Sequence, residues 1–165
     1  MPVVSNKMGE RSQMREIRLK VNDEWATGLV KPNTTLLRFL RDSGFTEVKK
    51  GCGEGDCGTC TVLLDGKAVN SCLILAPQVD GREVMTIEGL GTPERLHPLQ
   101  QKFVDHLSLQ CGFCGPGMLL SAKALLDENP DPSEEEVRTA ITGNLCRCTG
   151  YTKVTQAILD AAKKV

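Results

Sequence analysis

The eight cysteines of the sequence are its clearest candidates for chemistry, and they form two sets of four along the chain. The first set comprises Cys52, Cys57, Cys60 and Cys72, and the second comprises Cys111, Cys114, Cys146 and Cys148. The N-terminal segment shows no apolar stretch typical of an export signal, so we expect a reducing compartment, where structural disulfides are rare. Cysteine clusters in that setting more often bind metal, and four thiolates suit either structural zinc or an iron–sulfur cluster.

The first set has the spacing C-x4-C-x2-C, followed by eleven residues and a fourth cysteine. This pattern, with three cysteines close together and one remote, is the plant-type ferredoxin spacing for a 2Fe–2S cluster. Zinc sites more often use two short C-x-x-C pairs, so the asymmetry favours iron and sulfur. Four glycines lie among these cysteines, and they permit the backbone angles and close approach that a loop around a cluster needs: Gly51, Gly53, Gly55 and Gly58.

The second set has the spacing C-x2-C…C-x-C, which by itself allows zinc or iron–sulfur. Cys111 and Cys114 precede a helix that we expect to begin near Pro116, and the other two cysteines precede a helix that begins near Thr152. Both pairs therefore lie where free N–H groups and the positive end of a helix dipole stabilise negative charge. This placement supports a metal site, and the neighbouring first set favours iron–sulfur.

The first half of the chain predicts strands around one helix. Apolar and charged residues alternate over 17–21, the segment Trp25–Val30 follows a turn, and Asn33 or Thr34 can cap a helix that carries Leu36–Leu40. Further strands are expected over 61–64, 67–75 and 83–87, separated by Asp-Gly turns. A hairpin, a helix and more strands give an α+β fold.

The second half has a helical period. Apolar residues recur at intervals of three and four, which predicts four short amphipathic helices at 97–108, 116–128, 133–142 and 152–162. We therefore expect a flexible arm over residues 1–14, a ferredoxin-like domain over 15–90 and a helical domain over 91–165.

Three segments, GCGEGDCGTC, QCGFCGPGM and NLCRCTGY, together resemble the small 2Fe–2S subunit of the molybdenum hydroxylases. This family includes xanthine dehydrogenase, aldehyde oxidoreductase and carbon monoxide dehydrogenase, and the resemblance extends from about Arg15 to the C-terminus. It implies a β-grasp ferredoxin-like domain followed by a four-helix domain, each with one 2Fe–2S cluster. All eight cysteines would be ligands.

The resemblance also implies an electron-transfer role without a substrate site on this chain. The helical-domain cluster would lie nearest a molybdopterin cofactor, in some members its cytosine dinucleotide form, on a large subunit. The other cluster would lie nearer the FAD of a medium subunit, in a dimer of heterotrimers. Gln110 and Cys148 would approach the pterin. One departure is visible, because Gly115 stands where relatives typically carry Thr or Ser.

Two alternatives remain open from the sequence. One is a free-standing two-cluster ferredoxin-like carrier, and the other is a zinc-stapled interaction module. The formal net charge of −1 predicts no general attraction to nucleic acid. The sequence contains no run of 18 apolar residues, so we expect no membrane span. We therefore expect a cytoplasmic protein. The sequence does not identify a substrate.

Overall fold

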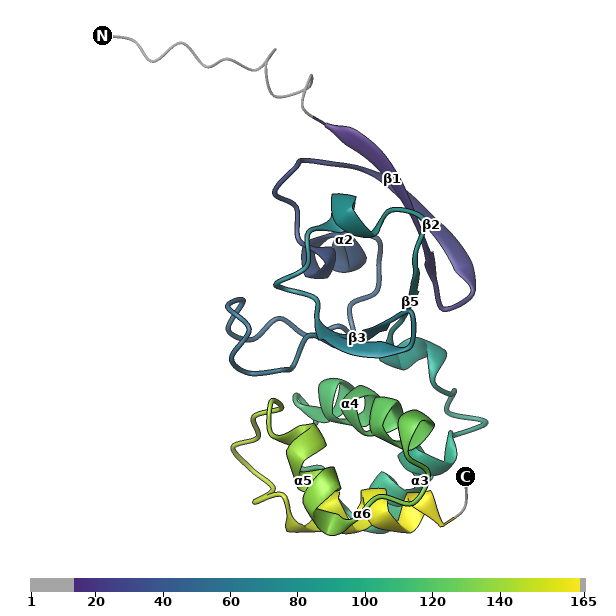
Figure 1. Ribbon diagram of the computed structural model, residues 1–165, viewed down its shortest axis with the longest axis vertical. Helices are drawn as coiled ribbons and strands as arrows, with labels where there is room; N and C mark the ends of the chain where they lie inside the picture. The colour runs from purple at the N-terminus through teal and green to yellow at the C-terminus, as the bar shows by residue number, and fades with distance from the viewer. Residues whose placement is uncertain (1–13, 164–165) are drawn as a thin grey trace, which may run out of the picture.

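The computed structural model describes residues 14–163, in which a mixed β-sheet with one helix is followed by a group of helices (Figure 1). The α+β class predicted from the sequence is confirmed. The predicted flexible arm over residues 1–14 lies, apart from Met14, outside the described residues.

The sheet is built from two hairpins joined by a short strand. Its strand order is β2-β1-β5-β3-β4, with β1 and β5 parallel and the other neighbours antiparallel. The strands have these bounds: β1 Arg15–Val21, β2 Glu24–Val30, β3 Thr61–Leu64, β4 Lys67–Asn70 and β5 Glu83–Met85. Two expected strands are shorter than predicted, because the chain turns after Asn70 and a short 3-10 helix, η2 (Ile87–Gly89), follows β5.

Helix α2 (Leu36–Asp42) packs against this sheet through four buried side chains: Leu36, Leu37, Phe39 and Leu40. Its cap is Thr35, whose hydroxyl accepts the N–H of Arg38, so the predicted cap at Asn33 or Thr34 was one or two residues early. Thr34 instead accepts the N–H of Lys31 in the preceding turn. Gly44 follows the helix in the left-handed region, as a helix end requires.

The second half is helical. Its helices are α3 Pro98–Asp105, α4 Gly115–Glu128, α5 Glu134–Ile141 and α6 Thr152–Ala162. Helix α5 begins with the predicted capping box between Ser133 and Glu136. Helix α3 has a box that the sequence did not reveal, in which His97 accepts the N–H of Leu99 and Gln100 accepts the N–H of His97.

Two separate hydrophobic cores correspond to these two halves. One core draws its buried side chains from residues 17–84 and the other draws them from residues 90–161. Helix α4 lies against β3 and β4, so the two halves meet along this helix (Figure 1). Both cysteine sets lie near this junction, which places them within reach of each other.

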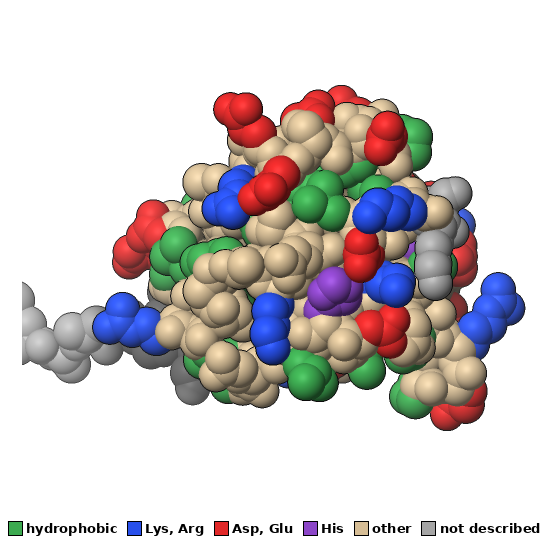
Figure 2. Space-filling view, turned by 90° about the horizontal axis from the view of Figure 1, so that it is seen from below, with side chains coloured by type: hydrophobic (Ala, Val, Ile, Leu, Met, Phe, Trp, Pro, Cys, Tyr) green, Lys and Arg blue, Asp and Glu red, His purple; other side chains and the backbone are tan. Residues whose placement is uncertain are grey.

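The surface of the helical end carries both signs of charge. Figure 2 views the molecule from that end and shows Lys and Arg side chains interspersed with Asp and Glu, without a large area of one sign. Such a face lacks the basic patch expected of a nucleic-acid interface. No helix within residues 14–163 is long and apolar enough to cross a bilayer.

Candidate metal centres

Three cysteines of the first set lie in a loop between α2 and β3, and the fourth, Cys72, follows the β3–β4 hairpin. Thr61 pairs with Asn70 across the β3–β4 hairpin, and both the N–H and the hydroxyl of Ser71 donate to the carbonyl of Cys60. This register brings Cys72 beside Cys60, although eleven residues separate them in the chain. The side chain of Asn70 also donates to the carbonyl of Gly55 at 3.0 Å and so holds the loop against the hairpin.

Backbone N–H groups point at the sulfurs of this loop. The N–H of Cys52 donates to Cys57 Sγ at 3.3 Å, and the N–H of Glu54 donates to Cys52 Sγ at 3.4 Å. The hydroxyl of Thr59 lies 3.3 Å from Cys57 Sγ. Donors of this kind stabilise thiolates and the negative charge of a bound cluster. The predicted use of glycine is also seen, since a side chain on Gly51 would collide with Cys57 Sγ.

The second cysteine set joins two segments that lie far apart in the chain. Cys111 and Cys114 precede α4, with Cys114 as its N-cap, and Cys146 and Cys148 precede α6. The thiol of Cys148 donates to Cys111 Sγ at 3.7 Å, and Cys114 shares a hydrogen bond with Cys146. The packing of the helices brings the two segments together, and the predicted placement of both pairs before helix N-termini is observed.

The sulfurs of each set lie in two pairs. These pairs are Cys52 with Cys57, Cys60 with Cys72, Cys111 with Cys148 and Cys114 with Cys146. No three His, Cys, Asp or Glu side chains in the described part of the chain converge as ligands of a single metal ion. A tetrahedral zinc site needs four ligands around one ion, whereas the iron atoms of a 2Fe–2S cluster each take two thiolates. The paired arrangement therefore fits the two-iron cluster.

The thiols of these pairs differ in acidity. Bonds from the N–H groups of Glu54 and Cys57 lower the pKa of Cys52 to about 6. Burial raises the pKa of Cys72 to about 11 and that of Cys114 to about 12, with their neighbouring cysteines adding to the effect. For Cys146, burial acts upward, but donors led by the Thr149 hydroxyl outweigh it and lower the pKa to about 7. Cys52 and Cys146 are thus more readily ionised for metal binding at neutral pH than Cys72 and Cys114.

The two sites are joined by direct hydrogen bonds. The N–H of Leu145 donates to the carbonyl of Cys57 at 2.9 Å, and the buried side chain of Asn144 donates to the carbonyl of Gly58 at 3.0 Å. A side chain on Gly58 would overlap the carbonyl of Gly143, and one on Gly117 would overlap that of Gly58. The close approach therefore depends on these two glycines.

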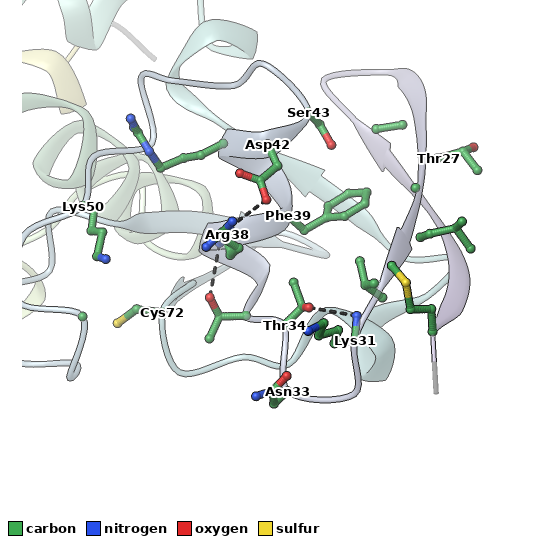
Figure 3. A pocket seen from close by; sticks show the side chains of 18 of the residues that line it. Thr27, Lys31, Asn33, Thr34, Arg38, Phe39, Asp42, Ser43, Lys50 and Cys72 are labelled. Carbon is green, nitrogen blue, oxygen red and sulfur yellow. Dashed lines mark hydrogen bonds and ion pairs between the residues drawn. The ribbon is translucent and has the colours of Figure 1, made fainter. Parts of the chain in front are cut away.

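A groove of about 1200 Å³ opens beside the first set, between β2, α2 and the cysteine loop (Figure 3). Its lining includes the exposed Cys52 and the buried Cys72, together with Lys50 and the ion pair between Arg38 and Asp42. The first set thus reaches the surface at this groove through Cys52.

Gln110, which the family resemblance singles out, has an exposed side chain beside the second set. Its Nε2 donates to the carbonyl of Cys148 at 2.9 Å, which leaves its side-chain oxygen available as an acceptor. Gly115 begins α4, and a side chain there would press on the end of Leu109, a flexible neighbour.

Sequence reasoning missed four polar residues around the cysteines: Thr59, Asn144, Thr149 and Tyr151. The signal for Asn144 was a polar residue two positions before a cysteine pair, and Tyr151 is the single tyrosine of the chain. Neither fact reveals the tertiary contacts that give these residues their place.

Comparison with known proteins decides between the chemistries that these sites allow. Residues 19–86 match the model of a 2Fe–2S iron-sulfur cluster binding domain, and residues 86–159 match that of a [2Fe-2S] binding domain. The chain is 48% identical to the nicotinate dehydrogenase small FeS subunit of Eubacterium barkeri, over 90% of this chain and 95% of the relative.

The chain belongs to the small iron–sulfur subunits of the molybdenum hydroxylases. Within this family it is also 42% identical to the xanthine dehydrogenase iron-sulfur-binding subunit of Escherichia coli O157:H7, over 80% of this chain and 84% of that one. The quinoline 2-oxidoreductase structure from Pseudomonas putida 86 contains a chain with 45% identity and a TM-score of 0.87, covering 92% of this chain and 95% of its own. The chain is therefore an electron-transfer subunit of an oxidoreductase.

Proposed function

We propose that this chain holds one 2Fe–2S cluster on each cysteine set and carries electrons between the partner subunits of a molybdenum hydroxylase. The ligands would be Cys52, Cys57, Cys60 and Cys72 in one site, and Cys111, Cys114, Cys146 and Cys148 in the other. A 2Fe–2S cluster supplies one-electron chemistry when bound. Electron transfer between the two clusters would then depend on the distance and the contacts that this chain sets between the two sites.

The observation that carries the proposal is the hydrogen bond from Leu145 N–H to the carbonyl of Cys57. Leu145 directly precedes Cys146, so a ligand of one site reaches a ligand of the other through backbone bonds and one hydrogen bond. Asn144 adds a second contact to Gly58 and a third, of 3.3 Å, to the hydroxyl of Thr61. A chain that bound two unrelated ions would have no need of so close a junction.

The two cores support the predicted domain division. Residues 15–90 would form a β-grasp ferredoxin-like domain, and residues 91–165 a four-helix domain. Each core lies against one cysteine set and contains two of its cysteines as buried or packed members. Each half can therefore hold its cluster while the junction at Gly58 sets their separation.

The second site would face the large, molybdopterin-binding subunit. Phe113 is 47% exposed and Leu145 is 54% exposed beside this site, and exposed apolar side chains of this size are typical of a partner surface. Gln110 and Cys148 would then approach the molybdopterin, including its cytosine dinucleotide form, with the free oxygen of Gln110 accepting a hydrogen bond.

The first site would face the medium, FAD-binding subunit. The groove beside Cys52 offers the surface where the sulfurs of this set are most accessible. The small, medium and large subunits would form a heterotrimer, and two heterotrimers would form a dimer in the cytoplasm. The substrate of the complex lies with the large subunit, since relatives serve nicotinate, xanthine and quinoline enzymes.

Purification and two variants test this proposal. A subunit should co-purify with two larger chains, with molybdopterin and with FAD, whereas a free carrier would elute alone. Cys57→Ser should leave the helical-domain cluster intact and stop electron delivery to the flavin, measured by flavin reduction under substrate. Unchanged flavin reduction would count against the proposed order. Cys148→Ser should perturb the molybdenum EPR spectrum, and an unperturbed spectrum would argue against contact between Cys148 and the pterin.

A further inference from the structure

A closed set of hydrogen bonds links three residues of the segment that carries Cys146. The hydroxyl of Thr149 donates to Cys146 Sγ at 3.2 Å, and the same oxygen accepts the N–H of Tyr151 at 3.3 Å. The phenol oxygen of Tyr151 in turn accepts the N–H of Cys146 at 2.7 Å. Each of the three residues therefore holds another in place.

The Thr149 hydroxyl is the donor in the bond to the Cys146 sulfur. Because the Thr149 oxygen already accepts the Tyr151 N–H, its proton is free to point at Cys146. A thiolate that ligates iron has no proton of its own and can only accept. The threonine hydroxyl is therefore a donor to this sulfur whenever Cys146 is a ligand.

The backbone of Tyr151 is strained and is held in place by its neighbours. Its φ of 68° lies in the left-handed region, which is unusual for a residue with a bulky side chain. Its ring packs partly buried against the helical core, and its phenol oxygen is bonded to Cys146. The N–H of Tyr151 donates to the Thr149 hydroxyl, so this strained residue holds the donor in place.

We propose that Thr149, oriented by Tyr151, is a positioning residue that raises the reduction potential of the helical-domain cluster. This inference rests on the proposed function, in which Cys146 is a cluster ligand. Reduction adds negative charge to the cluster and its sulfurs, so a hydroxyl donor stabilises the reduced state more than the oxidised state. The potential of this cluster relative to the other then depends on one side chain outside the ligand set.

The first site provides a matched comparison. Thr59 lies 3.3 Å from Cys57 Sγ, so each site has one threonine hydroxyl on one sulfur. Cys57 and Leu145–Cys146 are also the residues that form the bridge between the sites. Removing one hydroxyl at a time should therefore move one potential at a time.

The test is an EPR-monitored redox titration of the purified complex carrying Thr149→Val, Thr149→Ala, Thr149→Ser or Thr59→Val. We expect the valine and alanine variants to keep both cluster signals and to lower only the helical-domain potential. A tenfold change in the ratio of reduced to oxidised cluster corresponds to about 59 mV for one electron, and we expect a shift of about that size. Thr149→Ser should stay near the wild-type value, and Thr59→Val should shift only the other signal.

The outcomes separate this inference from the proposed function. Absence of iron–sulfur signals from the wild-type protein would overturn the proposed function itself. With both signals present, an unchanged helical-domain potential in Thr149→Val would overturn the role of Thr149 alone. Loss of the helical signal in both hydroxyl-free variants would also contradict a tuning role and would assign the threonine to cluster assembly.

Discussion

The two cysteine sites bring four sulfurs together in different ways. In the first site, three cysteines lie within one loop, and the β3–β4 hairpin brings the fourth beside Cys60. In the second site, two pairs from distant segments meet only when the helices that follow them, α4 and α6, join the common helical core. The difference suggests that local chain geometry organises the first site, whereas tertiary packing organises the second.

Both sites have hydrogen-bond donors to their sulfurs. Backbone N–H groups of Cys52 and Glu54 serve the first site, and they are positioned by glycine-rich loop conformation. In the second site, the hydroxyl of Thr149 and the backbone N–H groups of Cys148 and Thr149 donate to Cys146, while the phenol oxygen of Tyr151 accepts the N–H of Cys146. Each site also has one threonine hydroxyl at a sulfur, Thr59 in the first and Thr149 in the second, and each of these side chains can be removed by a single mutation.

Removal of one buried cysteine ligand from each site should have the largest effect, because it should remove one cluster at a time. We expect Cys114→Ala to lose the helical-domain cluster and to reduce the iron content from about four to about two atoms per chain. Cys60→Ala should lose the other cluster with the same loss of iron. EPR spectra of the reduced complexes identify which signal is absent.

The two variants should differ in stability as well. Without its cluster, the first site keeps its hairpin, whereas the helical half loses the link between its cysteine segments. We therefore expect a larger fall in melting temperature for Cys114→Ala than for Cys60→Ala. Equal falls would contradict the distinction between local and tertiary organisation.

The junction between the sites should be the next most sensitive point. Gly58 has a φ of 66°, and an added Cβ would overlap the carbonyl of Gly143. Gly58→Ala should therefore cost about 2–5 kcal/mol in free energy of unfolding and slow electron transfer between the clusters. Denaturant unfolding and flash-photolysis kinetics measure the two effects.

A matched control is available at Gly81, which has a similar φ of 79° and no atom within 4 Å of an added Cβ. Gly81→Ala should cost only about 1 kcal/mol, from backbone strain, and leave inter-cluster transfer unchanged. If the two alanine variants behaved alike, the close approach at Gly58 would not be the cause.

Asn144 should have a smaller effect at the same junction. Asn144→Ala removes the bonds to the carbonyl of Gly58 and the hydroxyl of Thr61, which should cost about 1–2 kcal/mol. The carbonyl of Gly58 keeps the hydroxyl and N–H of Thr61 as donors, which limits the loss. Asn70→Ala, within the first site, is the control variant, and urea unfolding measures the loss of stability in both. If Asn70→Ala slowed electron transfer between the clusters as much as Asn144→Ala, that result would count against a special role for Asn144.

The smallest expected effect is a pH dependence at the α3–α6 contact. Lys163 and His106 lower the pKa of Asp160, so its carboxylate is favoured in the folded state. This stabilisation is present above the unfolded pKa of about 3.9 and is lost as pH falls through the lower folded pKa. Asp160→Asn should reduce the melting temperature at pH 7, and its difference from wild type should shrink as pH falls below the unfolded pKa of about 3.9. A difference that did not shrink with falling pH would assign the effect to something other than charge.

The sequence predicted the parts of the molecule that depend on spacing. Strand alternation, helix period and capping patterns identified most elements, and the cysteine spacing identified both sets. The errors were at the ends of elements, such as Thr35 in place of Thr34 as a helix cap, where neighbouring residues compete for the same role.

Sequence spacing could not predict the contacts between segments that fold together from far apart. The bond from Asn144 to Gly58 joins residues 86 positions apart, and no periodicity encodes it. The left-handed conformation of Tyr151 was equally hidden, because a tyrosine gives no conformational signal of the kind that glycine gives. The junction and the Thr149 donor therefore required the structure.

The most direct measurement of the central claim is the metal and sulfide content of the purified complex, combined with EPR of its reduced form. The paired sulfurs predict about four iron atoms and about four acid-labile sulfides per small subunit, with two distinct 2Fe–2S signals. Zinc without sulfide, or a single cluster signal, would contradict the account.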